Sequence, residues 1–476
     1  MAVKQYLNYI NGEWIGQDLE QKEVINPATL EVVAQVPYGG TDLAKLATDA
    51  AAEAFESWKT LTAEERSAYL YRWYELVKEN ELDIAKTMTT EQGKPLQEAL
   101  GEVRYANGYI LWYAEEAKRI YGETIPASHR DKRLLVHHQP IGVVAAITPW
   151  NFPAAMITRK LAPALAAGCT AVMKPAQYTP LTAIKLIELA EQAGIPKGVL
   201  NLVTGSSSQI GKAWNEDSRV RKLTFTGSTE VGKLLMKDAA DTMKKVSLEL
   251  GGHAPFIILK DADLDRAVEG VLASKFRNAG QTCICTNRVF VHESIEEQFV
   301  ARLTEAVEKF KIGNGLDEGT DIGPLIDEAA IDKVDEQVKD AVSKGAKVTV
   351  GGARPDLEGF YYEPTVISNV QDDMLCMYEE TFGPLVPVTT FKTIDEAVER
   401  ANNSPFGLAA YVFTTNLTEA IQVSEALEYG IVGLNDGAPS TPQAPFGGFK
   451  ESGLGREGGR QGIEDYLETK FISIRL

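Results

Sequence analysis

The chain has 476 residues, of which 44% are hydrophobic and 24% are charged, a balance typical of a soluble globular protein and not of a disordered one. This length exceeds what one small core can organise, so we expect two or three domains. The formal net charge of −19 disfavours nucleic acid and anionic membrane as partners, because both bind basic surfaces.

The sequence also indicates the compartment. The first ten residues lack the apolar core of a signal peptide, and no later segment reaches the ~20 apolar residues that span a bilayer. The four cysteines, Cys169, Cys283, Cys285 and Cys376, are too few for a secreted disulfide framework. The histidines show no metal-ligand spacing. We therefore expect a cytoplasmic protein without a metal site.

Two regions outside the main pattern have their own signals. Residues 41–118 show the amphipathic spacing of helices that cover a neighbouring domain. Leu134 to His138 and Ile472 to Leu476 are short, partly alternating strands. Because unpaired strands near a surface tend to pair with another chain, we predict sheet-mediated oligomerisation. The alternative is that these two segments pair inside one chain.

Strands and helices alternate from about residue 141 onward. A helix should begin at Thr179 and Pro180, with a hydroxyl cap and proline in the first turn, and end at Gly194. Another helix should begin near Gln209. The predicted strands are Ile141 to Thr148, Thr170 to Met173, Val199 to Val203 and Leu223 to Phe225. This alternation predicts a parallel sheet covered by helices, as in a nucleotide-binding domain.

A second α/β region begins after Gly252. We expect helices near 264–279, 294–310, 328–344, 394–402 and 417–429, and strands near 288–292, 347–350, 386–391 and 409–413. The fold class is α/β, with a Rossmann-type cofactor domain, an α/β catalytic domain and a small β arm for oligomerisation. The corresponding boundaries are 1–118 and 140–251 for the cofactor domain, 252–449 for the catalytic domain, and 119–139 with 450–476 for the arm and tail.

The candidate nucleophile is Cys283. A lone cysteine is more often a buried, inert residue than a reactive one. Here the flanking residues are unsuited to a core, because Gly280 and the polar Gln281, Thr282, Thr286 and Asn287 surround the thiol in sequence. A thiolate adds readily to an electrophilic carbonyl carbon, so this segment predicts covalent catalysis.

Two further residues complete the candidate catalytic set. Asn151 follows a predicted strand end, where its side-chain amide can donate to an oxyanion together with the Cys283 backbone N–H. Alone, such an asparagine is more often a turn former. In Leu248-Glu249-Leu250 the strand period separates the carboxylate from the two leucines, so Glu249 can act as a base toward water. The following Gly251 and Gly252 indicate close approach of another group.

These motifs, from Trp150 to Arg456, resemble the aldehyde dehydrogenase family, and within it the bacterial succinate-semialdehyde dehydrogenases. The resemblance implies an aldehyde dehydrogenase-like fold and oxidation of an aldehyde through a cysteine thiohemiacetal and thioester. Family members that transfer the acyl group to coenzyme A lack the acid at Glu249, so its presence favours a free carboxylic acid as product. The family also implies dimers or tetramers.

The resemblance assigns cofactor positions that local patterns leave open. A G-x-G-x-x-G motif is absent after the first strand. Matches to the family imply that Trp150, Gly205, Gly227 and Ser228 surround the pyrophosphate, with Lys174 at the adenosine ribose and Glu380 and Phe382 at the nicotinamide riboside. Many NAD-dependent relatives carry glutamate where this chain has Gln177. We therefore expect NADP as cofactor, with NAD also plausible.

Substrate candidates come from the same resemblance. Arg159, Arg277 and Ser440 match residues of the succinate-semialdehyde branch, and an arginine fork suits a carboxylate. The implied reaction is oxidation of succinate semialdehyde to succinate in 4-aminobutyrate degradation. Glutarate semialdehyde, one methylene longer, is the nearest alternative. A catalytically silent nucleotide-binding protein of this fold is the other, and it predicts loss of Cys283, Glu249 or Asn151.

Cys285 is a candidate redox residue, because a thiol two residues after the nucleophile can come within disulfide range if the loop bends. Some relatives use such a pair as a switch. The alternative is a packed thiol without a regulatory role.

Overall fold

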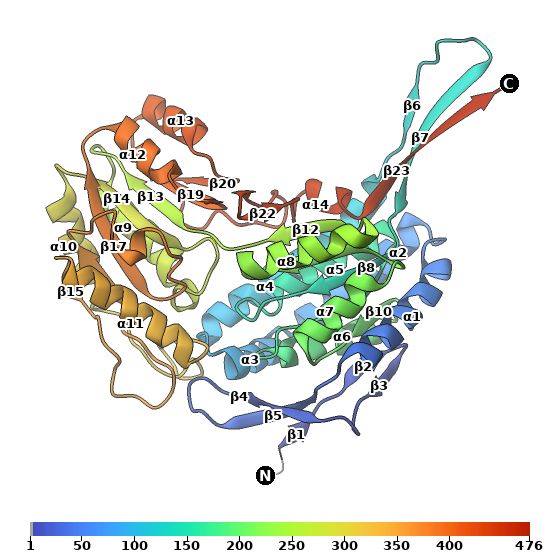
Figure 1. The fold of residues 1–476 in the computed structure, drawn as a ribbon, viewed down its shortest axis with the longest axis horizontal. Helices are drawn as coiled ribbons and strands as arrows, with labels where there is room; N and C mark the ends of the chain where they lie inside the picture. The colour runs from blue at the N-terminus through green and yellow to red at the C-terminus, as the bar shows by residue number, and fades with distance from the viewer. Residues whose placement is uncertain (1–2) are drawn as a thin grey trace.

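The computed structural model describes residues 3–476 as two α/β lobes side by side, with a narrow β arm projecting from one of them (Figure 1). The predicted α/β class is confirmed. Each lobe has its own sheet and its own core of buried apolar side chains, so each lobe is packed as a separate unit.

The first lobe contains an eight-stranded sheet with the order β22-β12-β11-β8-β9-β10-β2-β3. Its bounds are β2 Asn8–Ile10, β3 Glu13–Ile15, β8 Val143–Ile147, β9 Thr170–Lys174, β10 Leu200–Leu202, β11 Val220–Thr226, β12 Lys245–Glu249 and β22 Gly453–Leu454. Strands β12 to β10 run parallel, as the alternation predicts. The antiparallel edge strands β2, β3 and β22 were not predicted.

Eight helices cover this sheet on both faces (Figure 1). They are α1 Thr41–Trp58, α2 Ala63–Glu79, α3 Glu81–Gln92, α4 Leu96–Glu116, α5 Ala155–Ala167, α6 Pro180–Gln192, α7 Ser207–Glu216 and α8 Thr229–Ala239. The predicted hydroxyl cap of α6 is wrong. The Thr179 hydroxyl donates to the Trp150 carbonyl at 3.4 Å instead, and the buried Glu91 carboxylate accepts from the Leu181 and Thr182 N–H groups at 2.7 and 2.8 Å. A side chain from α3 therefore satisfies these orphan donors.

The second lobe has a seven-stranded sheet with the order β15-β16-β17-β14-β13-β19-β20. Its strands are β13 Ala254–Ile258, β14 Thr286–His292, β15 Lys347–Val350, β16 Thr365–Ser368, β17 Leu385–Phe391, β19 Ala409–Phe413 and β20 Ile431–Leu434. Its helices are α9 Leu264–Val271, α10 Glu296–Val307, α11 Glu328–Ser343, α12 Ile394–Asn402 and α13 Leu417–Ala426. All pairs except the edge pair β15 and β16 are parallel.

The helix expected near 264–279 ends much earlier, at Val271. A π-helical turn spans 272–276, and a short 3-10 turn follows at Arg277–Gly280. Asn278 and Ala279 adopt left-handed backbone conformations with φ of 54° and 53°. A buried polar side chain needs hydrogen-bond partners, and this break in the helix places the Asn278 amide against the Asn151 and Gln281 carbonyls.

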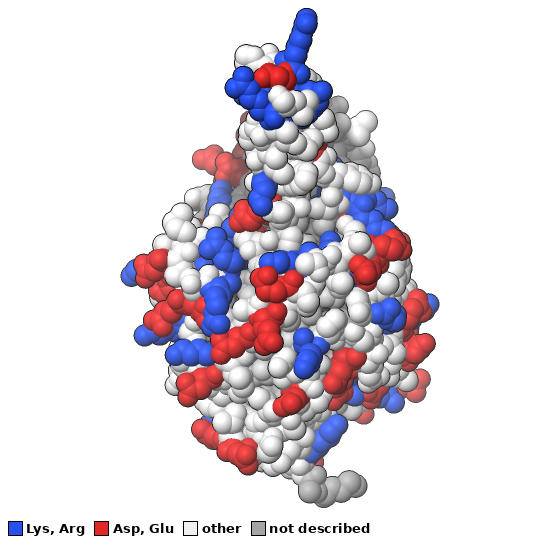
Figure 2. Space-filling model, turned by 90° about the vertical axis from the view of Figure 1, so that its right-hand side faces the viewer, with Lys and Arg blue, Asp and Glu red and all other residues white. Residues whose placement is uncertain are grey.

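The arm is a three-stranded antiparallel sheet, β23-β7-β6, with β6 Glu123–Ile125, β7 Lys132–Pro140 and β23 Leu467–Arg475. The expectation that the two arm strands lack partners within the chain is wrong, because Ile472 lies opposite Leu135. The outer edges of β6 and β23 have no paired strand within residues 3–476. Figure 2 shows lysine and arginine side chains gathered at the tip of the arm, whereas both signs of charge mix over the body below.

The tail boundary at residue 450 also differs from the expectation. Strand β22 pairs with β12, and Ile463 and Tyr466 are buried in the first lobe's core, so only β23 belongs to the arm. The remaining elements are short: β1 Lys4–Gln5, β4 Gln21–Ile25, β5 Val32–Pro37, β18 Phe406–Gly407, β21 Phe449–Lys450 and α14 Gln461–Glu464, with 3-10 turns at Ala117–Arg119, Ala240–Thr242 and Leu375–Met377.

Every helix within residues 3–476 is too short or too polar to span a bilayer. Residues 3–476 also contain no group of three or more His, Cys, Asp or Glu side chains placed to hold a metal ion.

Candidate active site

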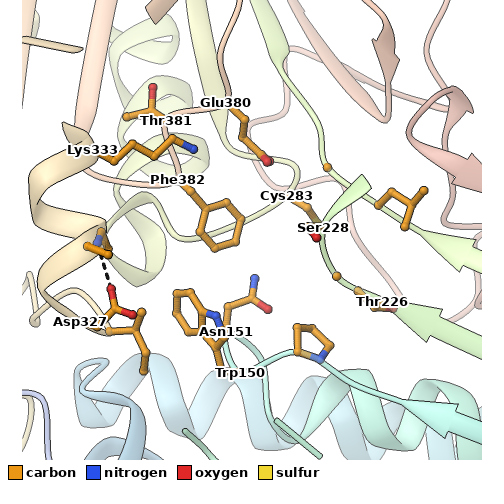
Figure 3. A pocket seen from close by; sticks show the side chains of 17 residues that line it. Trp150, Asn151, Thr226, Ser228, Cys283, Asp327, Lys333, Glu380, Thr381 and Phe382 are labelled. Carbon is orange, nitrogen blue, oxygen red and sulfur yellow. Dashed lines mark hydrogen bonds between the residues drawn. The ribbon is translucent and has the colours of Figure 1, made fainter. Parts of the chain in front are cut away.

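A cavity of about 390 Å³ is lined by residues from both lobes, and the main sequence candidates meet there (Figure 3). The first lobe supplies the segment after β8 and the turn between β11 and α8. The second supplies Cys283, residues of α11 and the segment before β17. Its lining therefore includes Trp150, Asn151, Gly227, Ser228, Cys283, Glu380 and Phe382.

Cys283 lies between the 3-10 turn and β14, and its half-buried side chain faces the cavity. Burial raises the pKa of the thiol to about 12, and the positive charge of Arg159 opposes this rise. The close approach expected at Gly252 is also present: a Cβ there would overlap the Cys283 carbonyl oxygen. Gly252 therefore allows the nucleophile loop to lie directly against the end of β12.

Asn151 is 3% exposed and its amide points toward the same cavity (Figure 3). Its Nδ2 donates to the Gln281 carbonyl at 3.0 Å, two residues before the nucleophile. An amide nitrogen has two N–H groups, so a second donor remains for a group bound beside Cys283. This arrangement suits an oxyanion site.

Glu249 ends β12 and is 2% exposed. It does not line the main cavity but is buried behind it, and its charge helps to raise the pKa of Cys283, which requires proximity. Its Oε2 has no hydrogen-bond partner among residues 3–476. Burial raises the pKa of Glu249 well above its usual range, and the neighbouring Glu457 charge raises it further. A carboxylate in this environment is a stronger base than an exposed one.

Glu457 is a site residue that the sequence reasoning missed. Although burial opposes ionisation, the charges of Arg159 and Lys160 lower the pKa of Glu457, and it forms salt bridges with both. The available signal was an acidic residue inside the glycine-rich run from Gly453 to Gly459, which was assigned to the tail. Two cations and one anion are thus buried beside Glu249.

Glu380 and Phe382 form one wall of the cavity. Glu380 Oε1 accepts from the Gly252 N–H at 3.1 Å, while Oε2 forms no hydrogen bond within the described residues. Burial raises the pKa of Glu380 to about 7. The Phe382 ring lies edge-on to Trp150, with ring centroids 5.7 Å apart. A free carboxylate oxygen beside aromatic rings fits the ribose hydroxyls and the flat ring of a nicotinamide nucleotide.

The phosphate candidates separate in the structure. Ser228 caps α8 by accepting from the Val231 N–H at 3.4 Å, and it lines the cavity with Gly227, so a helix N-terminus faces the space. Gly205 lies outside this cavity. Its φ is +143°, and a Cβ would overlap the Gly39 backbone, so contact with Gly39 explains the glycine.

Lys174 and Gln177 follow β9. Lys174 is buried and has no carboxylate partner among residues 3–476, where its Nζ donates only to the adjacent Pro175 carbonyl at 3.2 Å. Burial lowers the pKa of Lys174 to about 8. Gln177 is exposed and lines a neighbouring hollow of about 380 Å³. Both positions leave polar groups open to a ligand.

The three substrate candidates differ in how their polar groups are satisfied. Arg159 is 1% exposed, forms a salt bridge with Glu457 and lies over the Phe446 ring at 4.2 Å, so its charge is already shared. The half-buried Arg277 lies over the Phe152 ring at 5.0 Å, and its guanidinium forms no salt bridge or hydrogen bond with residues 3–476. The Ser440 hydroxyl is also buried without a partner in that range.

Cys285 is fully buried and both it and Cys283 are free thiols. Its thiol donates to the Gly280 carbonyl at 3.1 Å, and the buried Lys275 ammonium lies 3.8 Å from the sulfur. A redox role for Cys285 stays a prediction.

Comparison with known proteins agrees with this geometry. The model of the aldehyde dehydrogenase family matches residues 14–472. The chain is 57% identical to a glutarate-semialdehyde dehydrogenase of Pseudomonas putida, over 98% of this chain and 97% of the relative. It is 54% identical to the NADP-dependent succinate-semialdehyde dehydrogenase of Escherichia coli, with the same coverage. The crystal structure of succinate-semialdehyde dehydrogenase from Burkholderia pseudomallei superposes with a TM-score of 0.98 at 51% identity, covering 99% of this chain and 98% of that one. The chain belongs to the aldehyde dehydrogenase family.

Proposed function

We propose that this enzyme oxidises succinate semialdehyde to succinate with NADP, in the degradation of 4-aminobutyrate. The observation that carries the substrate assignment is the unpaired Arg277 guanidinium together with the unpaired Ser440 hydroxyl. The Arg277 charge acts on the buried Glu98 carboxylate but forms no salt bridge with it. A half-buried cation without a salt bridge is costly, and a substrate carboxylate would compensate it with charge-assisted hydrogen bonds. Arg159 already forms a salt bridge with Glu457, so we expect it to contribute less than Arg277 to binding the substrate carboxylate.

The first step is attack of the Cys283 sulfur on the aldehyde carbon. A C–S bond forms, the carbonyl π electrons move to oxygen, and the thiohemiacetal oxyanion accepts from the Asn151 amide and the Cys283 backbone N–H. The thiol must first lose its proton to solvent; burial opposes this loss, and the positive charge of Arg159 favours the thiolate. Each of these two donors lowers the activation barrier by about 3 kcal/mol.

NADP, when bound, accepts the hydride that leaves the former aldehyde carbon. Trp150, Ser228, Lys174 and Gln177 would hold its phosphates and adenosine, and Glu380 and Phe382 its nicotinamide riboside. Gln177 is neutral and exposed, so it does not repel a 2′-phosphate as a glutamate would.

The thioester on Cys283 is then hydrolysed. Glu249 takes a proton from water, the hydroxide adds to the acyl carbon, and the C–S bond breaks to release succinate and the thiol. The buried Glu457, Arg159 and Lys160 beside Glu249 set how readily it ionises. Two cations against one anion keep the pKa of Glu249 from rising further.

The decisive experiment compares kcat/KM for succinate semialdehyde, glutarate semialdehyde and a neutral aldehyde, each with NADP and NAD. We expect succinate semialdehyde with NADP to be preferred, and replacement Arg277→Leu to lose the preference for acidic substrates. The control is Arg302→Leu, which removes an exposed arginine outside the site. Arg288 is not used, because its guanidinium is hydrogen-bonded in the core. Equal turnover of a neutral aldehyde by the unmodified enzyme would contradict the carboxylate site.

Glutarate semialdehyde is the second candidate, favoured by the 57% identical relative of that name. One methylene in a pocket is worth only about 1–3 kcal/mol, so the same Arg277 and Ser440 groups can hold either carboxylate. The kinetic comparison separates them directly. A ratio of kcat/KM above ten in favour of glutarate semialdehyde would replace the first assignment.

We also propose that the enzyme is a cytoplasmic homodimer or homotetramer. The edge of β23 offers unpaired backbone groups to a second copy, and the exposed Phe471 lies on this strand. Light scattering coupled to gel filtration should give a multiple of 52.0 kDa. A monomer at micromolar concentration would refute the role of the arm.

A further inference from the structure

We propose that Asn278 is a positioning residue that ties the two parts of the oxyanion site together. Asn278 is 1% exposed, and its Nδ2 donates to the Asn151 carbonyl at 2.9 Å and to the Gln281 carbonyl at 3.2 Å. Asn151 follows β8 in the first lobe, whereas Gln281 lies two residues before Cys283 in the second. One side chain therefore links the donor residue to the nucleophile loop across the boundary between the lobes.

The orientation of the Asn278 amide is fixed by groups that cannot flip. The Gln92 Oε1 accepts from the Lys94 backbone N–H at 3.0 Å, so its Nε2 points to the Asn278 Oδ1 at 2.9 Å. The Asn278 Nδ2 must then face the two carbonyls. Because a backbone N–H stands at one end of this chain and two backbone carbonyls at the other, each amide has only one satisfied orientation.

The Asn151 carbonyl has a second donor. Lys94 Nζ donates to it at 2.8 Å and lies 2.5 Å from Glu102 Oε2. Glu102 Oε1 in turn accepts from the Ala154 and Ala155 N–H groups, at 2.9 and 3.2 Å, at the start of α5. The backbone of Asn151 is thereby held from the first lobe as well as from Asn278.

These contacts set the position of the Asn151 side chain. One N–H of its amide is taken by the Gln281 carbonyl, and the other is left for the oxyanion. The Gln281 carbonyl therefore accepts from both amides, that of Asn151 and that of Asn278. A displacement of about 1 Å of a catalytic donor costs about 100-fold in rate, so loss of the tie should act on the step that forms the oxyanion. This inference rests on the proposed chemistry at Cys283, but not on which aldehyde is the substrate.

The left-handed backbone at Asn278, φ 54°, makes glycine the least disruptive replacement. In the full-length enzyme with NADP, Asn278→Gly should lower kcat by about 10- to 100-fold, below the ~10²- to 10³-fold expected for loss of the donor itself. The KM for NADP should change less than threefold. The primary isotope effect with 1-deuterated succinate semialdehyde should rise, because a less stable oxyanion is present in smaller amount, which slows the hydride transfer that follows and makes it rate-limiting.

Two further variants separate positioning from stability. Gln92→Met keeps Asn278 but removes the group that orients it, so it should lower kcat in the same direction by a smaller factor. The double variant should be no slower than Asn278→Gly alone, because Gln92 acts through Asn278. Asn201→Ala is the matched control: this buried asparagine on β10 also donates to two backbone carbonyls, of Gly198 at 2.7 Å and Ala171 at 3.3 Å, away from the cavity. It should lower thermal stability and leave kcat and the isotope effect unchanged.

The proposal is overturned if folded Asn278→Gly keeps kcat within threefold with an unaltered isotope effect, or if the two single effects simply multiply. If Asn278→Gly does not fold, Gln92→Met decides alone, and an unchanged kcat and isotope effect in it overturns the proposal. Propanal serves as a second probe throughout. If the unmodified enzyme fails on succinate semialdehyde but oxidises propanal, the substrate assignment fails, and the variant-to-parent ratio on propanal still tests Asn278.

Discussion

The close contact between Gly252 and the nucleophile loop makes a sharp prediction. In Gly252→Ala the added Cβ would overlap the Cys283 carbonyl oxygen and would also lie 3.3 Å from the Leu408 Cβ, so it has no free direction. Ordinary contacts begin at 3.4 Å, and the loop must therefore move by about 1 Å relative to β12. Since the sulfur must reach the aldehyde carbon while the oxygen meets Asn151, we expect kcat to fall by about 100-fold.

The measurement is steady-state oxidation of the semialdehyde with NADP, together with the rate of Cys283 alkylation by iodoacetamide. Gly101→Ala is the control, because a Cβ there meets nothing within 4 Å and glycine inside helix α4 is unfavourable. That control should gain up to about 1 kcal/mol of stability and keep its activity. If Gly252→Ala were as active as Gly101→Ala while remaining folded, the inference that this glycine sets the position of the nucleophile would be wrong.

Three other substitutions test the site. Glu457→Gln removes a negative charge beside Glu249 and leaves two cations there without their counterion, so the pKa of Glu249 should fall. The rate of thioester hydrolysis should then begin to rise at a lower pH than in the parent enzyme. A shift to higher pH would contradict the assignment. The same change leaves buried charges unpaired and should cost about 3–5 kcal/mol in the free energy of unfolding, measured by urea titration. Gln177→Glu should lower kcat/KM for NADP about 10- to 100-fold by repelling a 2′-phosphate and leave the value for NAD within threefold; equal losses for both would remove Gln177 from cofactor discrimination. Glu249→Gln should allow one rapid burst of NADPH per active site and then stop, because acylation proceeds and hydrolysis does not; a sustained rate would show that another base activates water.

The alternation of elements was largely readable from the chain. The four central strands of the first sheet and the helices that follow them obey local rules, because parallel strands buried on both faces are continuous apolar runs. The N-terminal strands β2 and β3 were not predicted, since each is only three residues long, and β2 joins the sheet by pairing with the distant strand β10, where Tyr9 lies opposite Leu202. The cap of α6 was misassigned for a similar reason. Its acceptor, Glu91, lies on another helix.

The candidate site shows the same division. The resemblance of the Cys283, Asn151 and Glu249 segments to a known family makes these residues catalytic candidates from the sequence alone, because each motif is local. Which polar groups remain free is a different matter. Arg159 and Arg277 look equivalent in sequence, yet Arg159 forms a salt bridge with Glu457, whereas Arg277 forms no salt bridge within residues 3–476. Gly205 and Gly252 likewise look alike as turn glycines, but they contact different backbones.

The sequence alone thus determined the fold class, most of the order of the elements and the candidate nucleophile, since local patterns and short motifs express all three. Only the tertiary structure decided that Glu457 lies beside Glu249, that the arm strands pair with each other, and that Asn278 joins Asn151 to the nucleophile loop. Those contacts link residues that are 127 to 343 positions apart. Burial and charge compensation act through space, so no local pattern along the chain specifies them.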